Sequence, residues 1–111
     1  ILDDGIHIKG MAHITGGGII ENIPRVLPDN LTVEIDTNSW NTPNIFNLIQ
    51  ETGSVDSLEM HRAFNMGVGI VIIGDKTIEN KLQNVIRDYP TLTLSSIGDV
   101  VVGNEVKLLN L

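Results

Sequence analysis

Three consecutive glycines, Gly16, Gly17 and Gly18, constrain the fold of this chain more than any other feature of its sequence. Glycine inside a helix or strand costs backbone entropy on folding, so a glycine run is typical of a turn. An apolar run that ends at Ile14 precedes the glycines, and apolar residues recur at helical spacing after them. Thr15 stands where a helix N-cap is expected. The pattern predicts a strand, a glycine turn and a helix.

Such a turn is suited to bind a phosphate or another oxyanion. The first amide groups of a helix have no partner within it and carry the positive end of its dipole. The glycine run alone is not specific, because it matches neither GxGxxG nor GxxxxGK[ST]. A tight turn that binds no ligand is therefore an open alternative.

The rest of the chain predicts strands and helices in alternation around an aliphatic core. Hydrophobic residues make up 41% of the chain and aromatic residues 4%, and the abundant β-branched residues favour strands. Strands are expected at 6–14, 31–35, 70–74, within 92–102 and at 106–109, and helices at 16–27, 43–53, 57–63 and 76–89. Pro24 lies inside the first of these helices and is expected to kink it or to end its regular hydrogen bonding early. This order predicts an α/β or α+β domain, with α+β preferred: a mixed sheet with helices packed on it.

Charge and composition exclude several functions. The net charge of −7 argues against a protein that reads the phosphate backbone of DNA or RNA, which needs a basic face. The chain has no cysteine, and His7, His13 and His61 lack the spacing of metal ligands, so no metal site is expected. No apolar run approaches the ~20 residues of a membrane span. No signal peptide is visible, so we expect a cytoplasmic protein without a membrane partner.

His13 is the titratable residue best placed for chemistry, because it lies directly before the glycine turn. It could contact a substrate or move a proton, or it could be a structural histidine bonded to a nearby carbonyl group. Asn65, Gly67 and Gly69 form a second glycine stretch before an apolar run, which predicts a strand buried on both faces. The alternate glycines allow a ligand or another backbone to approach closely, and Asn65 either orients a ligand or caps a turn.

These motifs together resemble the aminoimidazole ribonucleotide synthetase family, also called phosphoribosylformylglycinamidine cyclo-ligase. The similar segments are GMAHITGGG at 10–18, ENIPRVLP at 21–28, Trp40 with PNIF at 43–46, and FNMGVG at 64–69. The similarity runs from about Gly5 to the end of the chain, and long motifs in this order are highly specific.

The resemblance implies that residues 1–111 are an incomplete C-terminal domain of such an enzyme. The first residues, ILDDG, resemble the last turn of a helix that ends at Gly5. The first strand of the domain and most of its first helix are therefore expected before Ile1. In this family, an N-terminal domain forms the homodimer and binds most of the ATP and Mg²⁺.

The implied reaction is the ATP-dependent cyclisation of formylglycinamidine ribonucleotide to aminoimidazole ribonucleotide in purine biosynthesis. ATP phosphorylates the formyl oxygen, a nitrogen attacks to close the ring, and phosphate leaves. Such phosphoryl transfer depends on positioning and charge stabilisation. The expected site comprises His13 as the catalytic or substrate-contacting residue, and Thr15, Gly16, Gly17, Gly18, Asn65, Gly67 and Gly69 for the substrate or the transferred phosphate.

Two kinds of alternative stay open. Formylglycinamidine ribonucleotide synthetase, selenophosphate synthetase and thiamine phosphate kinase share the fold that the resemblance implies, although their glycine motifs differ. The chain could also be a noncatalytic module that only binds a phosphorylated ligand. In either case the isolated chain is expected to be inactive, because the resemblance places half of the site on another domain.

Overall fold

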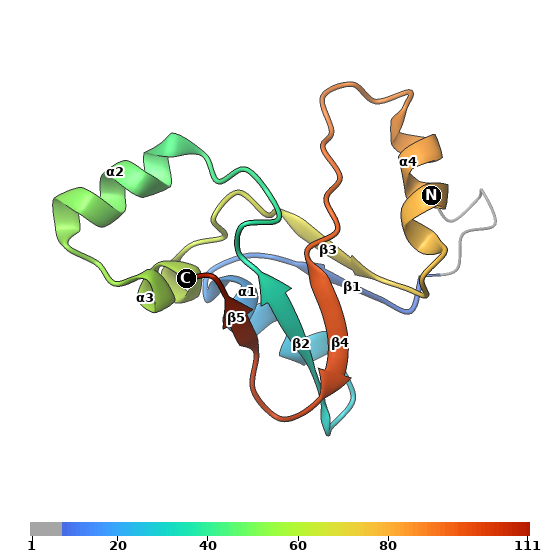
Figure 1. Cartoon of the computed structure of the whole chain (residues 1–111), viewed down its shortest axis with the longest axis horizontal. Coiled ribbons are helices and arrows are strands. Elements are labelled where there is room, and N and C mark those ends of the chain that lie inside the picture. The colour runs from blue at the N-terminus through green and yellow to red at the C-terminus, as the bar shows by residue number, and fades with distance from the viewer. Residues whose placement is uncertain (1–7) are drawn as a thin grey trace.

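The computed structural model of the chain describes residues 8–111, and the predicted helix end at Gly5 lies outside them. The described part contains strands and helices in alternation (Figure 1). In chain order they are β1 (Gly10–His13), α1 (Gly18–Asn22), the 3-10 helix η2 (Pro24–Val26), β2 (Leu31–Asp36), α2 (Asn44–Gly53), α3 (Ser57–Ala63), β3 (Ile70–Ile73), α4 (Ile78–Ile86), β4 (Gly98–Val102) and β5 (Lys107–Leu109). No helix in this part is long and apolar enough to cross a membrane.

The strands form two sheets. In one, β1 pairs with β3 in an antiparallel ladder; in the other, β2 lies between the antiparallel β4 and the parallel β5. The two sheets lie across one another, with α2 and α4 at opposite ends of the molecule (Figure 1). The expected α+β class with a mixed sheet is confirmed, and the structure adds the division into two sheets.

The core is aliphatic, as the low aromatic content predicts. It joins the inner faces of β1 and β3, the inner face of β2 and the short helix α1. Its buried residues are Ala12, Ile14, Ile19, Ile23, Val33, Ile35 and Val71. The turn between β1 and α1 is therefore anchored on both sides, by Ile14 before it and Ile19 after it, which limits its freedom to rearrange.

The helix after the glycines is much shorter than residues 16–27. α1 has five residues and gives way to η2 at Pro24, whose ring removes a backbone donor and prevents regular α-helical pairing. The N-cap position is occupied by Gly17, so the expectation that Thr15 caps this helix is wrong. A helix of this length has a small dipole, so the N-terminus of α1 contributes little to anion binding.

The outer face of the β1–β3 ladder is open, so the expectation that residues 70–74 are buried on both faces is wrong. Val71 is 8% exposed on the inner face, whereas Ile70 is 58% exposed on the outer face. Met11 and His13 share this outer face, because Met11 lies opposite Ile72 and His13 lies opposite Ile70. His13 therefore emerges from a largely apolar surface.

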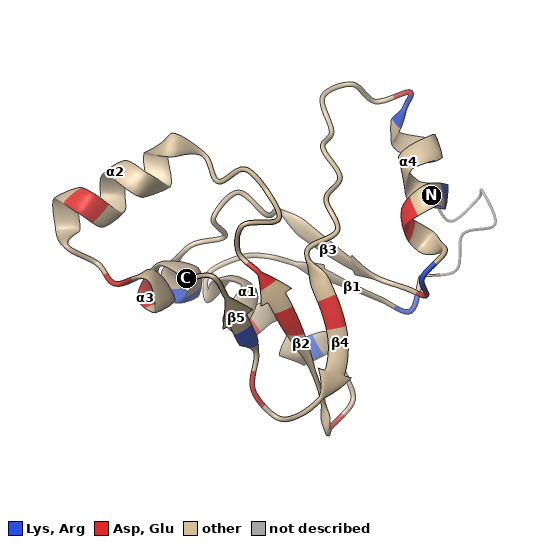
Figure 2. Cartoon of the chain, viewed as in Figure 1, with Lys and Arg blue, Asp and Glu red and all other residues tan. Residues whose placement is uncertain are grey.

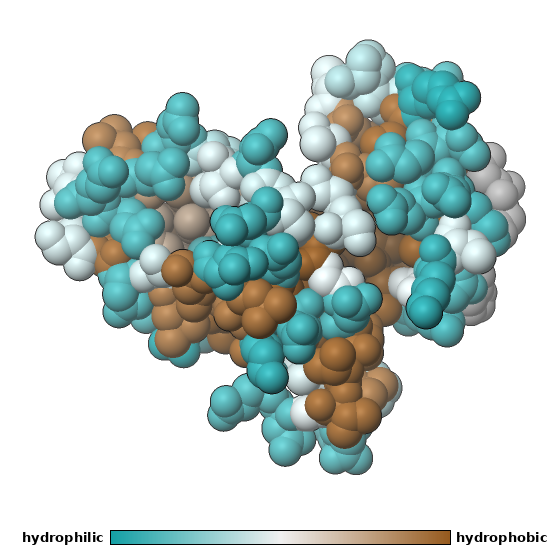
Figure 3. All heavy atoms as spheres, in the orientation of Figure 1, coloured by the Kyte–Doolittle hydropathy of each residue, from teal (hydrophilic) through white to brown (hydrophobic). Residues whose placement is uncertain are grey.

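The β2–β4 ladder carries both an apolar and an acidic surface. At one end of the ladder, Leu31 pairs with the exposed Val102, where Figure 3 shows an apolar patch. Further along, Glu34 lies between Asp99 on β4 and Lys107 on β5, and Figure 2 shows the red acidic positions of the β2 and β4 ribbons side by side. Like charges on paired strands repel each other, and this face is unsuited to bind phosphate.

Two hydrogen bonds from asparagines lower the pKa of Asp36 below its ordinary value of 3.8. The Asn110 side chain donates to Oδ1 at 2.8 Å, and the Asn38 backbone amide donates to it at 3.0 Å. Because the folded pKa is the lower one, this carboxylate stabilises the fold above about pH 3.8, and its contribution is lost as the pH falls through the folded pKa.

Replacing Asn110 with leucine should therefore raise the pKa of Asp36 back toward 3.8, because the largest cause of the shift is removed. NMR titration of the Asp36 carboxyl carbon measures this pKa in the folded protein. Asp75, whose pKa is lowered mainly by a hydrogen bond from the Thr77 hydroxyl, is the matched control and should keep its pKa in the variant. An unchanged Asp36 pKa would mean that the contact between β2 and the residue after β5 is not formed in solution.

Candidate functional site

The glycine turn after β1 presents open backbone amides. Gly18 donates its amide to the Thr15 carbonyl oxygen at 3.0 Å, which closes the turn. Within the described part of the chain, the amides of Gly16 and Gly17 donate to no protein group. Gly16 is also exposed, and nothing lies within 4 Å of the position that a Cβ atom would take there. Gly17 is half-buried, and the Glu21 carboxylate lies where a Cβ atom of Gly17 would be. Two adjacent amides without a protein partner can receive an anion when this exposed carboxylate side chain turns away.

Gly17 and Gly18 are needed for the shape of this turn. Their φ angles are +96° and +62°, in the left-handed region that residues with a side chain rarely adopt. A Cβ atom on Gly18 would overlap the carbonyl oxygen of His61 and lie 2.5 Å from that of Phe64. The first turn of α1 therefore lies directly against the C-terminal end of α3, and only glycine fits between them.

Asn22 holds the glycine turn from inside. Its side chain is 5% exposed, and its Nδ2 donates to the carbonyl oxygens of Gly18 at 2.8 Å, Thr15 at 3.2 Å and Gly16 at 3.4 Å. Its Oδ1 accepts from the Thr15 hydroxyl at 3.3 Å and from the Arg25 guanidinium at 3.3 Å. The sequence analysis did not predict a role for this residue. The pattern that could have indicated one is a polar asparagine placed one helical turn after the glycines, among apolar positions.

The second glycine stretch is a turn whose geometry is also fixed. The Asn65 Oδ1 accepts from the Gly67 amide at 2.8 Å, so this asparagine caps the turn, one of the two roles expected for it. Gly67 has a φ of +95°, and a Cβ atom there would lie 2.5 Å from Pro43 Cδ. The Met66 carbonyl oxygen accepts from Trp40 Nε1 at 3.1 Å. This turn is thus held against the loop before α2.

The two glycine stretches meet in space although about 50 residues separate them in the sequence. The Ile14 amide donates to the Gly69 carbonyl oxygen at 2.8 Å, extending the β1–β3 ladder to the edge of both turns. On the other side, Gly18 lies against the Phe64 carbonyl group, next to Asn65. The residues predicted from two separate motifs therefore border one region of the surface.

His13 lies at the edge of this region with its side chain free. The residue is exposed, and no group of the described residues forms a hydrogen bond with its imidazole. Among the described residues, His13 is therefore not a structural histidine bonded to a carbonyl group. An exposed imidazole beside open amides can contact a ligand and exchange a proton with it.

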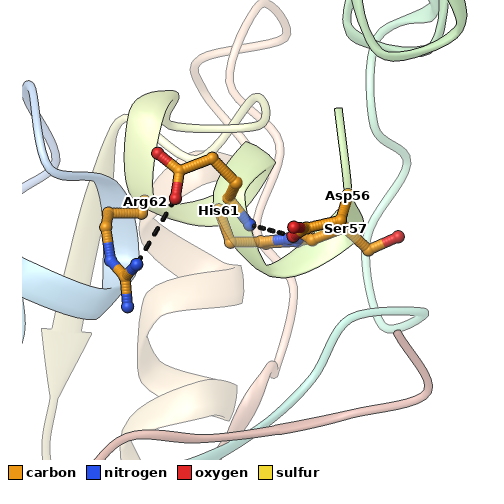
Figure 4. A network of polar contacts seen from close by, with 5 residues as sticks. Asp56, Ser57, His61 and Arg62 are labelled. Atoms are coloured by element: carbon orange, nitrogen blue, oxygen red, sulfur yellow. Dashed lines mark hydrogen bonds and ion pairs between the residues drawn. The ribbon is translucent and has the colours of Figure 1, made fainter. Parts of the chain in front are cut away.

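His61 has the structural role instead. It is 6% exposed, and its Nδ1 lies 2.8 Å from the Ser57 carbonyl oxygen (Figure 4). Its ring lies edge-on to that of Trp40, with the ring centroids 6.4 Å apart. On the same helix, Arg62 forms an ion pair with Glu59 at 3.3 Å, and Asp56 caps the helix through the Glu59 amide. The charges of α3 are thus satisfied locally, and its buried histidine supports the wall behind the glycine turn.

A shallow open pocket of about 780 Å³ lies beside the second glycine turn. Its lining side chains are mostly neutral and polar: Thr37, Asn38, Trp40, Asn41, Thr42, Pro43, Asn44 and Asn47. None of the predicted site residues lines it, although Pro43 is the residue that contacts Gly67. The pocket and the second glycine turn share the wall at Pro43, and the pocket lacks the charge or bare backbone that would favour phosphate.

The described residues do not fit a magnesium site. No group of three or more His, Asp or Glu side chains among residues 8–111 lies close enough together to hold a metal ion. Mg²⁺ prefers carboxylate and phosphate oxygens, and the glycine turns offer amide donors instead. One cation joins the hydrogen-bond network of the first turn: the exposed Arg25, which is bonded to Asn22 and has no carboxylate partner within these residues.

Comparison with known proteins bears on what this arrangement is for. Residues 1–109 match the family model described as AIR synthase related protein, C-terminal domain. The chain is similar to proteins named phosphoribosylformylglycinamidine cyclo-ligase: 47% identical to the one from Pseudothermotoga lettingae, over 95% of this chain and 30% of that protein. For the one from Caldanaerobacter subterraneus subsp. tengcongensis the identity is 46%, over 89% of this chain and 29% of that protein.

A shorter stretch of the chain is more similar to a third protein named phosphoribosylformylglycinamidine cyclo-ligase, from Neisseria meningitidis serogroup B. The identity is 58%, over 60% of this chain and 19% of that protein. The chain thus spans less than a third of the length of these curated relatives. The resemblance seen in the sequence is confirmed: the chain belongs to the family of AIR synthase related proteins, C-terminal domain.

Proposed function

We propose that this chain is part of an ATP-dependent cyclo-ligase that converts formylglycinamidine ribonucleotide to aminoimidazole ribonucleotide in purine biosynthesis. The relatives that it matches over most of its length carry the name of that enzyme. One structural observation supports the proposal above all. The two glycine stretches lie side by side, joined by the hydrogen bond from the Ile14 amide to the Gly69 carbonyl oxygen, and the exposed His13 lies next to them. This surface is where we place the substrate.

In this proposal the first glycine turn receives a phosphate group. The free amides of Gly16 and Gly17 stabilise negative charge without moving, which is how preorganised donors favour a charged transition state. The phosphate belongs either to the ribonucleotide or to the group transferred from ATP. Thr15 and Gly18 fix the turn through their mutual hydrogen bond. Their role is to support the two free amides.

His13 contacts the substrate beside this turn. Its imidazole donates a hydrogen bond to the substrate, or exchanges a proton with it during ring closure. Asn65, Gly67 and Gly69 form the opposite border of the site, where Asn65 and Gly67 maintain the turn and the exposed Gly69 leaves room for the ligand. None of these side chains carries a fixed charge, so positioning is their main contribution.

ATP and Mg²⁺ are assigned to a part of the enzyme outside residues 8–111, because these residues supply no carboxylate cluster for the metal ion. The complete enzyme is proposed to be a cytoplasmic homodimer that binds neither nucleic acid nor a membrane. The net charge of −7 supports the absence of nucleic-acid binding.

A coupled assay of ADP and aminoimidazole ribonucleotide formation tests the proposal. The complete protein that carries this sequence should turn over formylglycinamidine ribonucleotide with ATP, whereas the purified 111-residue chain should show no turnover, because we assign the nucleotide and metal ligands to another part of the enzyme. Turnover by the 111-residue chain alone would contradict the assignment of ATP to another part. A complete protein that binds the ribonucleotide without consuming ATP would favour the alternative of a noncatalytic binding module.

A further inference from the structure

We propose that Asn22 is a positioning residue that turns the backbone amides of Gly16 and Gly17 toward the ligand and holds the Arg25 guanidinium at the same turn, beside the Thr15 hydroxyl. The inference rests on the proposed function, because it explains how the phosphate-binding turn is made. It depends on no helix dipole, since α1 has five residues. Its basis is the geometry of the two peptide units on either side of Gly16.

The buried Asn22 amide holds the carbonyl oxygens of these two units. Its Nδ2 lies 3.2 Å from the Thr15 carbonyl oxygen and 3.4 Å from the Gly16 carbonyl oxygen. A trans peptide unit is planar, and its N–H and C=O groups point in opposite directions. The peptides here are trans, so the Gly16 and Gly17 amides, which share these units, point away from Asn22.

The same side chain also places a positive charge at the turn. The Asn22 Oδ1 accepts from the Arg25 guanidinium at 3.3 Å, and Arg25 is exposed with no ion-pair partner among residues 8–111. An uncharged amide can hold a guanidinium without neutralising it, whereas a carboxylate in the same place would form an ion pair with it. The pairing therefore leaves the charge of Arg25 available to an anion.

The substitution Asn22→Asp removes both effects at once with little change in volume. A carboxylate cannot donate to the two carbonyl oxygens, repels them, and forms an ion pair with Arg25. In the complete protein, we expect the inhibition constant for inorganic phosphate to rise at least tenfold. A merely structural defect would reduce the fraction of active enzyme and hence the apparent kcat, but it would leave the inhibition constant of the active fraction unchanged.

Asn84→Asp is the matched control. Asn84 accepts from Arg87 at 2.9 Å with the same three-residue spacing, but on the exposed surface of α4. Its inhibition constant for phosphate should match that of the unmodified enzyme. If Asn22→Asp fails to fold, Asn22→Ser, which keeps one donor, should still raise the constant about threefold.

Three outcomes of the phosphate-inhibition experiment would each overturn a different part of the account. An active enzyme in which Asn22→Asp, or Asn22→Ser in its place, leaves phosphate inhibition unchanged overturns the role of Asn22 alone. An active enzyme that phosphate does not inhibit, even unmodified, overturns both the phosphate turn and this inference. A complete protein without cyclo-ligase activity contradicts the proposed function itself.

Discussion

Replacing Gly18 with valine should lower the free energy of unfolding by about 3 kcal/mol or more, enough to remove much of the stability of a small domain. Two costs add up at this position. The φ of +62° is unfavourable for any residue with a Cβ atom, and a β-branched side chain would overlap the carbonyl groups at the end of α3. Neither neighbour can yield easily, because both contacts are to backbone atoms. Urea denaturation followed by Trp40 fluorescence measures the loss.

Gly16→Val is the matched control for this prediction. It places the same side chain two residues earlier, where nothing lies within 4 Å of the new Cβ atom and φ is not in the left-handed region. The free energy of unfolding should change by about 0.5 kcal/mol or less. If both variants lost stability equally, the close approach of α1 to α3 would not exist in solution.

Replacing His13 with alanine should lower kcat/KM of the complete enzyme by about 10²-fold, the loss expected when a proton-transferring or substrate-bonding group is removed. The free energy of unfolding should hardly change, because the imidazole is exposed and has no hydrogen-bond partner within the described chain. Steady-state kinetics and thermal unfolding of the same preparations measure the two effects separately.

The substitution His61→Ala should instead lower the free energy of unfolding. This buried ring is bonded to the Ser57 carbonyl oxygen and packs against Trp40, so its loss should cost about 2 kcal/mol of stability and leave a defect in the wall behind the site. Equal losses of stability in the two histidine variants would contradict the division of roles. A His13 variant with normal kcat/KM would remove His13 from the site.

The α+β class and the place of the glycine turn follow from patterns that are local in the sequence. Hydrophobic periodicity, Pro24 and the glycine run report on the backbone within a few residues, so the turn after β1 could be predicted. The length of α1 could be predicted only in part. Apolar spacing continues past Asn22 and favours one helix up to residue 27, and Pro24 predicts either a kink or an early end of regular hydrogen bonding; the structure has the early end, after five residues.

The distinction between structural and open glycines could not come from the sequence. Gly16 and Gly18 belong to the same run of three glycines, yet Gly16 is exposed and Gly18 touches α3, which begins about 40 residues later. The burial of β3 shows the same limit: its apolar run is continuous, but the ladder has two strands, and its outer face stays open. Tertiary contacts decide both, and residue order carries little information about them.

Titration of the ¹⁵N-labelled chain with formylglycinamidine ribonucleotide, followed by NMR, shows whether the two glycine turns and His13 form the ligand site. If they do, the largest chemical-shift changes occur at the amides of Gly16 and Gly17, with smaller changes at His13 and Gly69. Shifts confined to the pocket lined by residues 37–47, with the glycine amides unmoved, would contradict this site and place the ligand on the neutral surface beside α2.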